Sequence, residues 1–169
     1  MEFNELIYER RSTRSFKDEP VTAEQIEKML DAAIHAPNAC NFQSWHFYVV
    51  KSESARAKIG GMCGRWGLGA SVVFVVCTDA AQLEARFGER GRDLFAVQDT
   101  AAAIENLLLC AADIGLGGCW VGAFDEAACR EALDIPQGRR PVAIIPVGVP
   151  AEKPAMRARV DLSDVVTVI

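Results

Sequence analysis

Residues 93–114 read DLFAVQDTAAAIENLLLCAADI, and this stretch decides how the rest of the chain can be arranged. Alanine and leucine dominate it, both of which are strong helix formers, and Gly115 stands where a C′ glycine would end a helix. The polar residues Asp99, Asn106 and Asp113 lie seven apart and therefore form a narrow stripe along an otherwise apolar helix. The pattern predicts a long central helix buried on most of its sides. In a small protein such burial is typical of a helix that also contacts a second subunit.

Shorter segments with clear periodicity flank this helix. Thr22 and Gln25 have the spacing of a capping box, and apolar residues then recur at helical spacing. Aromatic and β-branched residues favour strands, and continuous apolar runs favour strands buried on both faces. We therefore expect helices over residues 22–35, 53–60 and 125–133, and strands within WHFYVV (45–50), ASVVFVVC (70–77), GLGGCWVGAF (115–124) and PVAIIPVGVP (141–150).

Phe3, Leu6, Ile7 and Arg10 would share one face of a further helix near the start. With that helix, the expected order of elements is α, α, β, α, β, α, β, α, β, followed by a polar tail from about residue 151. That order predicts an α+β fold in which helices flank a mixed central sheet. Helices between successive strands are compatible with some parallel pairing. The chain has 169 residues, half of them apolar, so we expect one domain over residues 1–169 that buries its core without disulfides or metal.

Composition excludes several classes of partner. The net charge is -5, so the chain lacks the generally basic surface that nucleic acids or anionic lipids require. Glu2 and Glu5 precede any apolar run, unlike a signal peptide, and we expect no stretch that approaches the length of a membrane span.

The six cysteines form no CxxC pair, which favours the interpretation that they are reduced and pack as small apolar side chains. We expect a soluble, cytoplasmic protein without a metal site.

The acidic chain carries one strongly basic stretch, RRSTRSF, at residues 10–16. The planar donor fork of arginine suits phosphate or carboxylate, and serine and threonine hydroxyls can donate to the same oxygens. Arg157 and Arg159 lie near the other end of the chain. These arginines indicate either an anion site shared by the two ends or, near the start, a helix C-terminus whose dipole favours basic residues. The residues alone leave both interpretations open.

Two further segments carry unusual chemistry. PNACNFQSW, residues 37–45, is rich in side-chain amides, which offer both donors and acceptors; an ordinary turn that uses asparagine for its backbone geometry is the alternative. The glycines of GLGGCWVGAF suit close backbone approach to a flat ring, or simply a helix end followed by a buried strand. They follow a helix rather than opening one, which excludes a Rossmann fingerprint.

Taken together and in order, four segments resemble the nitroreductase family of flavin mononucleotide (FMN) enzymes: RRSTRSF, PNACNFQSW, GLGGCWVGAF and KPAMRAR (153–159). The resemblance extends from Phe3 to the tail. It implies a homodimer with FMN at the subunit interface and the long helix within that interface. It also implies that electrons pass from NADH or NADPH to a small acceptor, such as a nitroaromatic or a quinone, by a ping-pong mechanism. The chemistry would then lie at flavin N5 rather than on a catalytic side chain.

The resemblance also assigns residues to the cofactor. Arg10 and Ser12 would hold the phosphate, and Arg14 would lie at the N1/O2 edge of the ring. The amide-rich loop would come from the partner subunit, and Gly122 or Ala123 would donate a backbone N–H to N5. The complete set of expected cofactor contacts is Arg10, Arg11, Ser12, Arg14, Pro37, Asn38, Ala39, Asn41, Gln43, Trp120, Val121, Gly122, Ala123, Arg157 and Arg159.

Two positions depart from the family pattern. Asn38 stands where serine is common, and Ser44 replaces a frequent proline, which leaves the loop backbone less constrained. Asp99 aligns with a flavin contact of some members, but its place on the polar stripe favours a carboxylate that faces solvent. Two alternatives therefore stay open: a flavoprotein of the same fold with another reaction, such as dehalogenation or oxidation, and a non-catalytic module that binds flavin or another phosphate.

Overall fold

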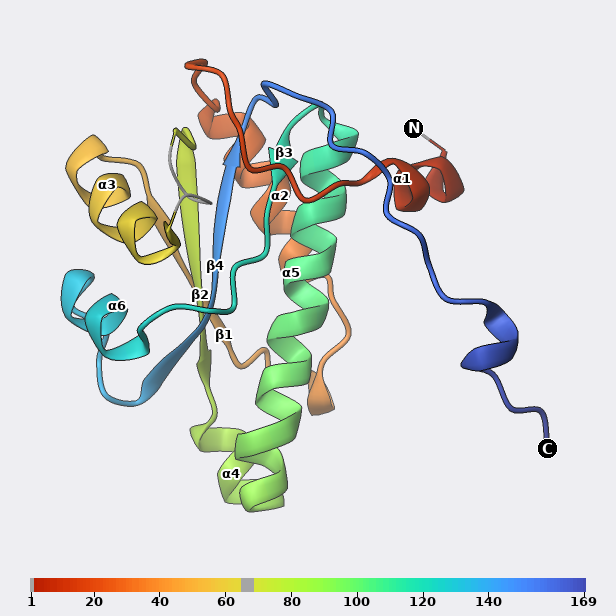
Figure 1. Ribbon diagram of the computed structural model, residues 1–169. Coiled ribbons are helices and arrows are strands. Elements are labelled where there is room, and N and C mark those ends of the chain that lie inside the picture. The colour runs from red at the N-terminus through yellow and green to blue at the C-terminus, as the bar shows by residue number, and fades with distance from the viewer. Residues whose placement is uncertain (1, 65–68) are drawn as a thin grey trace.

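The computed structural model describes residues 2–64 and 69–169. A four-stranded sheet lies at the centre, and helices cover both of its faces (Figure 1). In spatial order the strands are β1 (Trp45–Val50), β2 (Val72–Asp79), β4 (Arg139–Gly148) and β3 (Gly117–Gly118). The helices are α1 (Phe3–Glu9), α2 (Ala23–Ile34), α3 (Glu53–Met62), α4 (Ala81–Phe87), α5 (Ala96–Asp113) and α6 (Glu126–Ala132). This architecture confirms the α+β prediction.

The capping residues predicted from the sequence are found at the start of α2 and at the end of α5. The capping box of α2 is present, since Thr22 Oγ1 accepts from the Gln25 N–H at 3.2 Å and Gln25 Oε1 accepts from the Thr22 N–H at 2.9 Å. Helix α5 ends at Gly115, whose φ of 81° lies in the left-handed region that glycine adopts readily. The Leu116 N–H then donates to the Ala111 carbonyl at 2.8 Å, which closes the helix end.

The start of the long helix differs from the prediction. Helix α5 begins at Ala96, and a π-helical turn over Gly91–Phe95 precedes it. A Cβ at Gly91 would lie 2.1 Å from the Leu83 carbonyl oxygen of α4. Because the two backbones approach so closely, the chain enters α5 through this wider turn, a contact that helical periodicity does not reveal.

Strand pairing is simpler than the interleaved helices indicate. All three neighbouring strand pairs run antiparallel, including β1 and β2, although α3 lies between them in the chain. Helix α3 returns the chain to the end of the sheet that β1 left, so no crossover is needed. Within the described residues, parallel pairing is confined to an isolated bridge between Ser12 and Gly118. The segment GLGGCWVGAF contributes only β3 and a bridge from Val121 to Ile144.

The two faces of the sheet bury separate cores. Phe74 and Val76 of β2 face α2 and α5, whereas Val73 and Val75 face α3 and α6, as alternation along a strand requires. Every β2 residue except the last is buried, which confirms a strand covered on both faces. Helix α5 packs chiefly on α2 and β2, and its position fixes the segments that build the candidate site.

The expectation that no stretch of the chain approaches the length of a membrane span is wrong. Residues Gly91–Asp113, which include α5, form a helix long and apolar enough to cross a membrane by length and composition alone. Many of its apolar residues instead face α2 and the sheet, with Ile104 and Leu107 fully buried. Core helices of soluble proteins can have the same length and apolar composition, because burial within a protein selects the same side chains as burial in lipid.

The six cysteines form no disulfide. Four of them are buried beneath α3 and α6, namely Cys63, Cys77, Cys119 and Cys129. Burial raises the pKa of Cys63 to about 11 and that of Cys77 to about 12, because the apolar surroundings disfavour the thiolate. These thiols therefore stay protonated at neutral pH and pack as small apolar side chains.

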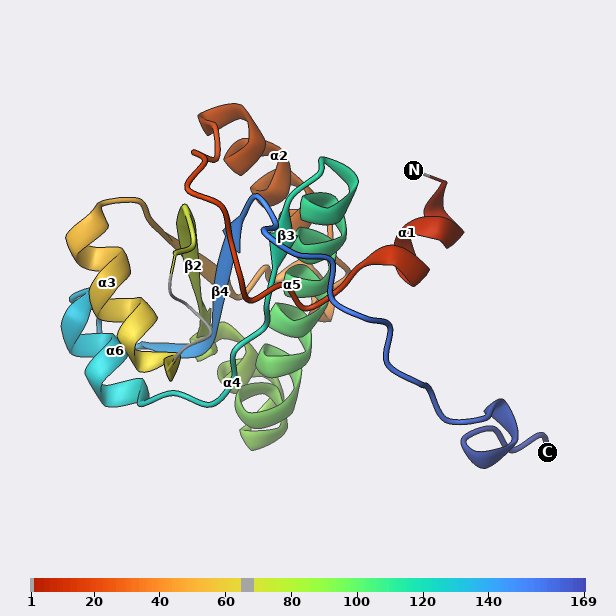
Figure 2. The same cartoon turned by 45° about the horizontal axis from the view of Figure 1, so that its top comes forward.

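The two ends of the chain stand away from the body (Figures 1 and 2). Helix α1 exposes apolar side chains, such as Phe3 at 67%. The tail after Pro154 contains only a short 3-10 turn, Leu162–Asp164. Its exposed apolar residues are Met156, Val160, Leu162, Val165, Val166, Val168 and Ile169.

Candidate functional site

The basic stretch 10–16 lies along the edge of the sheet as an extended segment. The Thr13 N–H donates to the Gly118 carbonyl at 2.9 Å, and the Lys17 N–H donates to the Val149 carbonyl at 2.9 Å. Thr13 is buried against Gly117, whereas its neighbours point outward. The sheet thus holds the backbone of this segment, and Arg10, Arg11 and Arg14 are partly buried along it.

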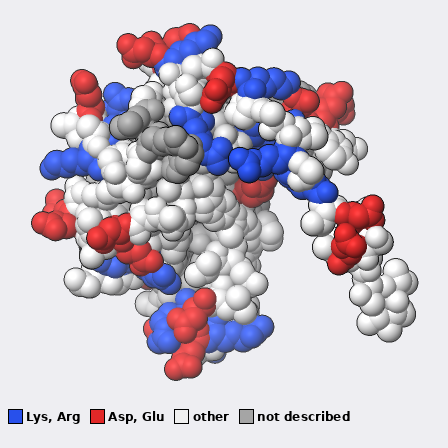
Figure 3. Space-filling model, viewed as in Figure 1, with Lys and Arg blue, Asp and Glu red and all other residues white. Residues whose placement is uncertain are grey.

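These arginines meet the arginines of the tail. A pocket of about 320 Å³ is lined by Arg10, Arg11, Ser12, Arg14, Pro154, Ala155, Arg157 and Arg159. We call it the arginine pocket. The two ends of the chain, more than 140 residues apart, therefore contribute five guanidinium groups to one cavity. Figure 3 shows basic side chains gathered where the N-terminal segment and the tail run, above a mostly uncharged surface over α5.

Most of this positive charge has no acidic partner. Arg10 pairs with Glu105 of α5 at 3.4 Å. Arg11 donates to the backbone carbonyls of Tyr8 and Arg10, and its buried Nε has no partner. Across residues 2–64 and 69–169, no ion pair joins a carboxylate to Arg11, Arg157 or Arg159, although Arg11 lies near enough to Glu9 to help lower the pKa of that carboxyl. An unpaired buried donor among clustered guanidinium groups fits an anion such as a phosphate.

A second pocket adjoins the arginine pocket at Arg14. It has a volume of about 320 Å³, and its walls comprise Arg14, Met62, Cys63, Gly64, Cys119, Trp120, Val121, Gly122 and Ala123. We call it the ring pocket. A Cβ built at Gly122 would meet nothing nearer than Trp120 Nε1 at 3.9 Å, so a flat group can approach the backbone there. Burial raises the pKa of Cys119 more than the adjacent Arg14 lowers it, so this thiol stays protonated at neutral pH.

Gly117 and Gly118, by contrast, serve packing within the protein. A Cβ at Gly117 would lie 2.4 Å from Thr13 Oγ1, and one at Gly118 would lie 2.8 Å from Leu108 Cδ2. The two glycines of β3 therefore admit the basic segment and α5 rather than a ligand. The buried-strand interpretation applies to the first half of GLGGCWVGAF, and the open backbone that would suit a ring lies in the second half.

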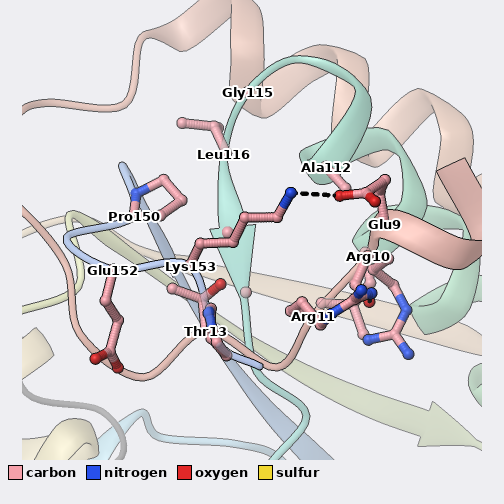
Figure 4. Close-up of a pocket in the computed structure, with 14 residues that line it drawn as sticks. Glu9, Arg10, Arg11, Thr13, Ala112, Gly115, Leu116, Pro150, Glu152 and Lys153 are labelled. Carbon is pink, nitrogen blue, oxygen red and sulfur yellow. Dashed lines mark hydrogen bonds and ion pairs between the residues drawn. The ribbon is translucent and has the colours of Figure 1, made fainter. Parts of the chain in front are cut away.

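A third pocket adjoins the arginine pocket on its other side (Figure 4). It has a volume of about 290 Å³ and shares Arg10, Arg11 and Pro154 with the arginine pocket. Lys153 extends across it to Glu9, with Nζ 2.7 Å from Oε2, and the ammonium lowers the pKa of that carboxyl. We call it the tail pocket. The sequence motifs did not reveal it, because its floor comes from α5 and its lid from residues 150–154.

The amide-rich loop lies at the opposite end of α5 from these pockets (Figure 1). Asp99, near the start of α5, contacts the loop, whereas Leu108 and Ala112 line the tail pocket. With a rise of 1.5 Å per residue, Asp99 and Ala112 are about 20 Å apart along the helix. One chain therefore does not bring Pro37, Asn38, Ala39, Asn41 and Gln43 to the pocket that holds the arginines.

Asp99 organises this loop, contrary to the expectation that it faces solvent. Its side chain is buried, with 4% of the residue exposed, and accepts from the Ala39 N–H at 2.9 Å and from Ser44 Oγ at 3.2 Å. Asn38 Oδ1 accepts from the Gln43 N–H at 2.9 Å. Three residues between these anchors have positive φ, namely Cys40, Asn41 and Gln43. Side-chain hydrogen bonds thus hold a loop whose backbone is strained.

We expect the Asp99→Ala variant to lose about 2 to 3 kcal/mol of unfolding free energy, because two loop donors would stay buried without their acceptor. Urea denaturation followed by circular dichroism measures the change. Asp18→Ala is the matched control, since Asp18 is exposed and the same substitution there should change stability by less than about 0.5 kcal/mol. Equal stability of the two variants would contradict the anchoring role of Asp99.

Comparison with known proteins places the chain among relatives along nearly its whole length. The model of the nitroreductase family matches residues 7–66 and 62–149. A Methanothermobacter thermautotrophicus protein, provisionally named an NADH dehydrogenase/NAD(P)H nitroreductase, is 37% identical over 163 residues, covering 93% of this chain and 82% of the relative. An FMN reductase [NAD(P)H] from Bacillus subtilis is 26% identical, covering 90% and 68%. A crystal structure of a nitroreductase family protein from Clostridium difficile superposes with a TM-score of 0.87 at 28% identity, covering 99% and 98%.

Proposed function

This chain belongs to the nitroreductase family, and on that premise we propose that it is an NAD(P)H-dependent oxidoreductase that uses FMN. One observation carries the proposal: a ring-sized pocket with an open glycine backbone adjoins a pocket lined by five arginines. Relatives named for NAD(P)H nitroreductase and FMN reductase activity support the electron donor and the flavin.

The residues of both pockets fit FMN. Arg10, Arg11 and Ser12 would hold the phosphate from the body, and Arg157 and Arg159 would close on it from the tail. A phosphomonoester carries a charge of about −1.5 to −2 at neutral pH, which the clustered guanidinium groups would neutralise.

The ring would lie in the ring pocket against Trp120, Val121, Gly122 and Ala123. Bound FMN would supply hydride transfer at N5, so no side chain need act as acid or base. Arg14 lines both pockets, and its fixed positive charge would favour the extra electron density of the reduced ring. A nitroaromatic or a quinone would then enter the same pocket after the nicotinamide leaves, as a ping-pong sequence requires.

We further propose that the protein is a homodimer, because one chain leaves the site incomplete. Val97 of α5 is 38% exposed, Ala101 and Leu109 are partly exposed, and the tail offers apolar side chains with nothing beneath them. A two-fold axis perpendicular to α5 would pack the helix antiparallel against its copy. The loop at the start of one α5 would then lie beside the arginine pocket at the end of the other. Pro37, Asn38, Ala39, Asn41 and Gln43 would line the partner's flavin.

One absorbance experiment tests the proposal. We expect the purified protein to show the two visible bands of oxidised flavin after FMN is added and the unbound FMN is removed, and to lose them when NADPH or NADH is added without oxygen. Size-exclusion chromatography should give the mass of two chains. A yellow protein that does not respond to NAD(P)H would instead favour oxidation or dehalogenation, and a protein that takes up no flavin would contradict the proposal. We place the activity in the cytoplasm, where nicotinamide nucleotides are available.

A further inference from the structure

The three pockets form a row. The ring pocket and the arginine pocket share Arg14, and the arginine pocket and the tail pocket share Arg10, Arg11 and Pro154. FMN would occupy only the first two, with its ring in one and its phosphate in the other. The tail pocket, with a volume of about 290 Å³, then lies directly beyond the phosphate.

The tail pocket has the chemistry of a nucleoside site. Apolar side chains from α5 and the segment after it form one wall, including Leu108, Ala112 and Leu116, and Pro150 and Pro154 stand among the tail residues of the lining. A flat heterocycle fits between apolar walls, and the carboxylates of Glu9 and Glu152 can accept from hydroxyl or amino groups.

The partition between the two pockets is positively charged. Arg10 and Arg11 line both cavities. A phosphate held there can be joined to a second phosphate whose nucleoside enters the tail pocket. A neutral aromatic substrate would use the apolar wall but not these arginines, so the shared guanidinium groups select a phosphorylated ligand.

Access to the tail pocket depends on one surface contact. Lys153 and Glu9 pair across it at 2.7 Å, but both side chains are well exposed, at 76% and 43%. Exposed pairs of this kind contribute little to stability, so a ligand can displace the contact readily. The freed ammonium would then add a donor for a phosphate.

We propose that the tail pocket binds the adenosine of an adenosine diphosphate group whose phosphates lie on Arg10 and Arg11. The inference rests on the proposed function, because it takes the arginine pocket as the phosphate site. Two molecules carry this group: FAD, whose flavin half would fill the other two pockets, and NAD(P)H, whose nicotinamide must reach the ring pocket.

Calorimetric titration of the full chain with ADP tests the proposal, with inorganic pyrophosphate as the probe for charge alone. ADP should bind the flavin-free protein about tenfold more tightly than pyrophosphate does, and bound FMN should weaken the binding of both because its phosphate uses the same arginines. Ala112→Phe, which fills the tail pocket from α5, should weaken the binding of ADP at least tenfold. It should leave the affinities for pyrophosphate and FMN unchanged. Ala112→Leu, a milder substitution, should weaken ADP less. Ala127→Phe, at an exposed position of α6, is the control and should change the affinity for none of the three ligands.

The comparison of ligands identifies the source of the group. Flavin-free protein that prefers FAD to FMN, with the preference lost in Ala112→Phe, assigns the pocket to FAD. Competition between ADP and NADPH on the FMN-loaded protein assigns it to the nicotinamide nucleotide. ADP that binds no better than pyrophosphate, or equally well to Ala112→Phe, overturns the inference. Failure of FMN itself to bind would count against the proposed function instead, because ADP is also titrated without flavin.

Discussion

Gly117→Ala should lower the free energy of unfolding by about 2 to 3 kcal/mol, although it adds a single methyl group. The new Cβ would lie 2.4 Å from Oγ1 and 2.6 Å from Cβ of Thr13, which is itself buried and hydrogen-bonded to Gly118. Neither partner can move without breaking the pairing of the basic segment with the sheet edge. Thermal unfolding followed by circular dichroism should show a melting temperature roughly 4 to 12 °C lower.

Two comparisons isolate the cause of this loss. Gly61→Ala lies in α3, where a Cβ would meet nothing within 4 Å, so it should be neutral or slightly stabilising as alanine favours helix. Thr13→Gly removes the atoms that collide, so Gly117→Ala should cost much less in that background. A loss as large in the double variant as in the single one would show that Thr13 is not the obstacle.

The regular elements follow from local physics, and the sequence therefore predicts them well. Capping by Thr22, termination at Gly115 and the continuous apolar run of β2 each depend on neighbours along the chain. The meeting of both termini in the arginine pocket was also expected, but from a resemblance. Charge patterning alone left the anion site open and favoured a helix end near the start of the chain.

The residues whose roles cannot be predicted from local sequence pattern make contacts with residues far away in the sequence. Asp99 belongs to a regular polar stripe, yet its partners Ala39 and Ser44 lie more than 50 residues earlier, so periodicity cannot distinguish it from a solvated residue. The space beside Gly117 is filled by Thr13, which is likewise distant in the sequence. Lys153 gains its importance only where the tail crosses Glu9. Each error concerns what fills the space beside a residue, which its sequence neighbours do not encode.

Arg10→Ala should weaken FMN binding by about 1.5 to 3 kcal/mol, a ten- to hundredfold rise in Kd, because a charge-assisted contact to the phosphate would be lost. The loss would include a second effect. Arg10 pairs with Glu105 at 3.4 Å, so its removal leaves a carboxylate beside the pocket without its partner, which would repel the phosphate. Quenching of flavin fluorescence on titration of the flavin-free protein measures Kd.

Riboflavin lacks the phosphate and supplies the decisive comparison for Arg10→Ala. Its Kd should change little, so the preference for FMN over riboflavin should fall by nearly the full factor. Arg140→Ala removes an equally charged side chain that pairs with Glu126 at 2.8 Å outside the three pockets, and it should leave both ligands unaffected. An Arg10→Ala protein that is folded and still prefers FMN as strongly as the parent would remove Arg10 from the phosphate site. Arg11, Arg157 and Arg159 would then have to hold the anion.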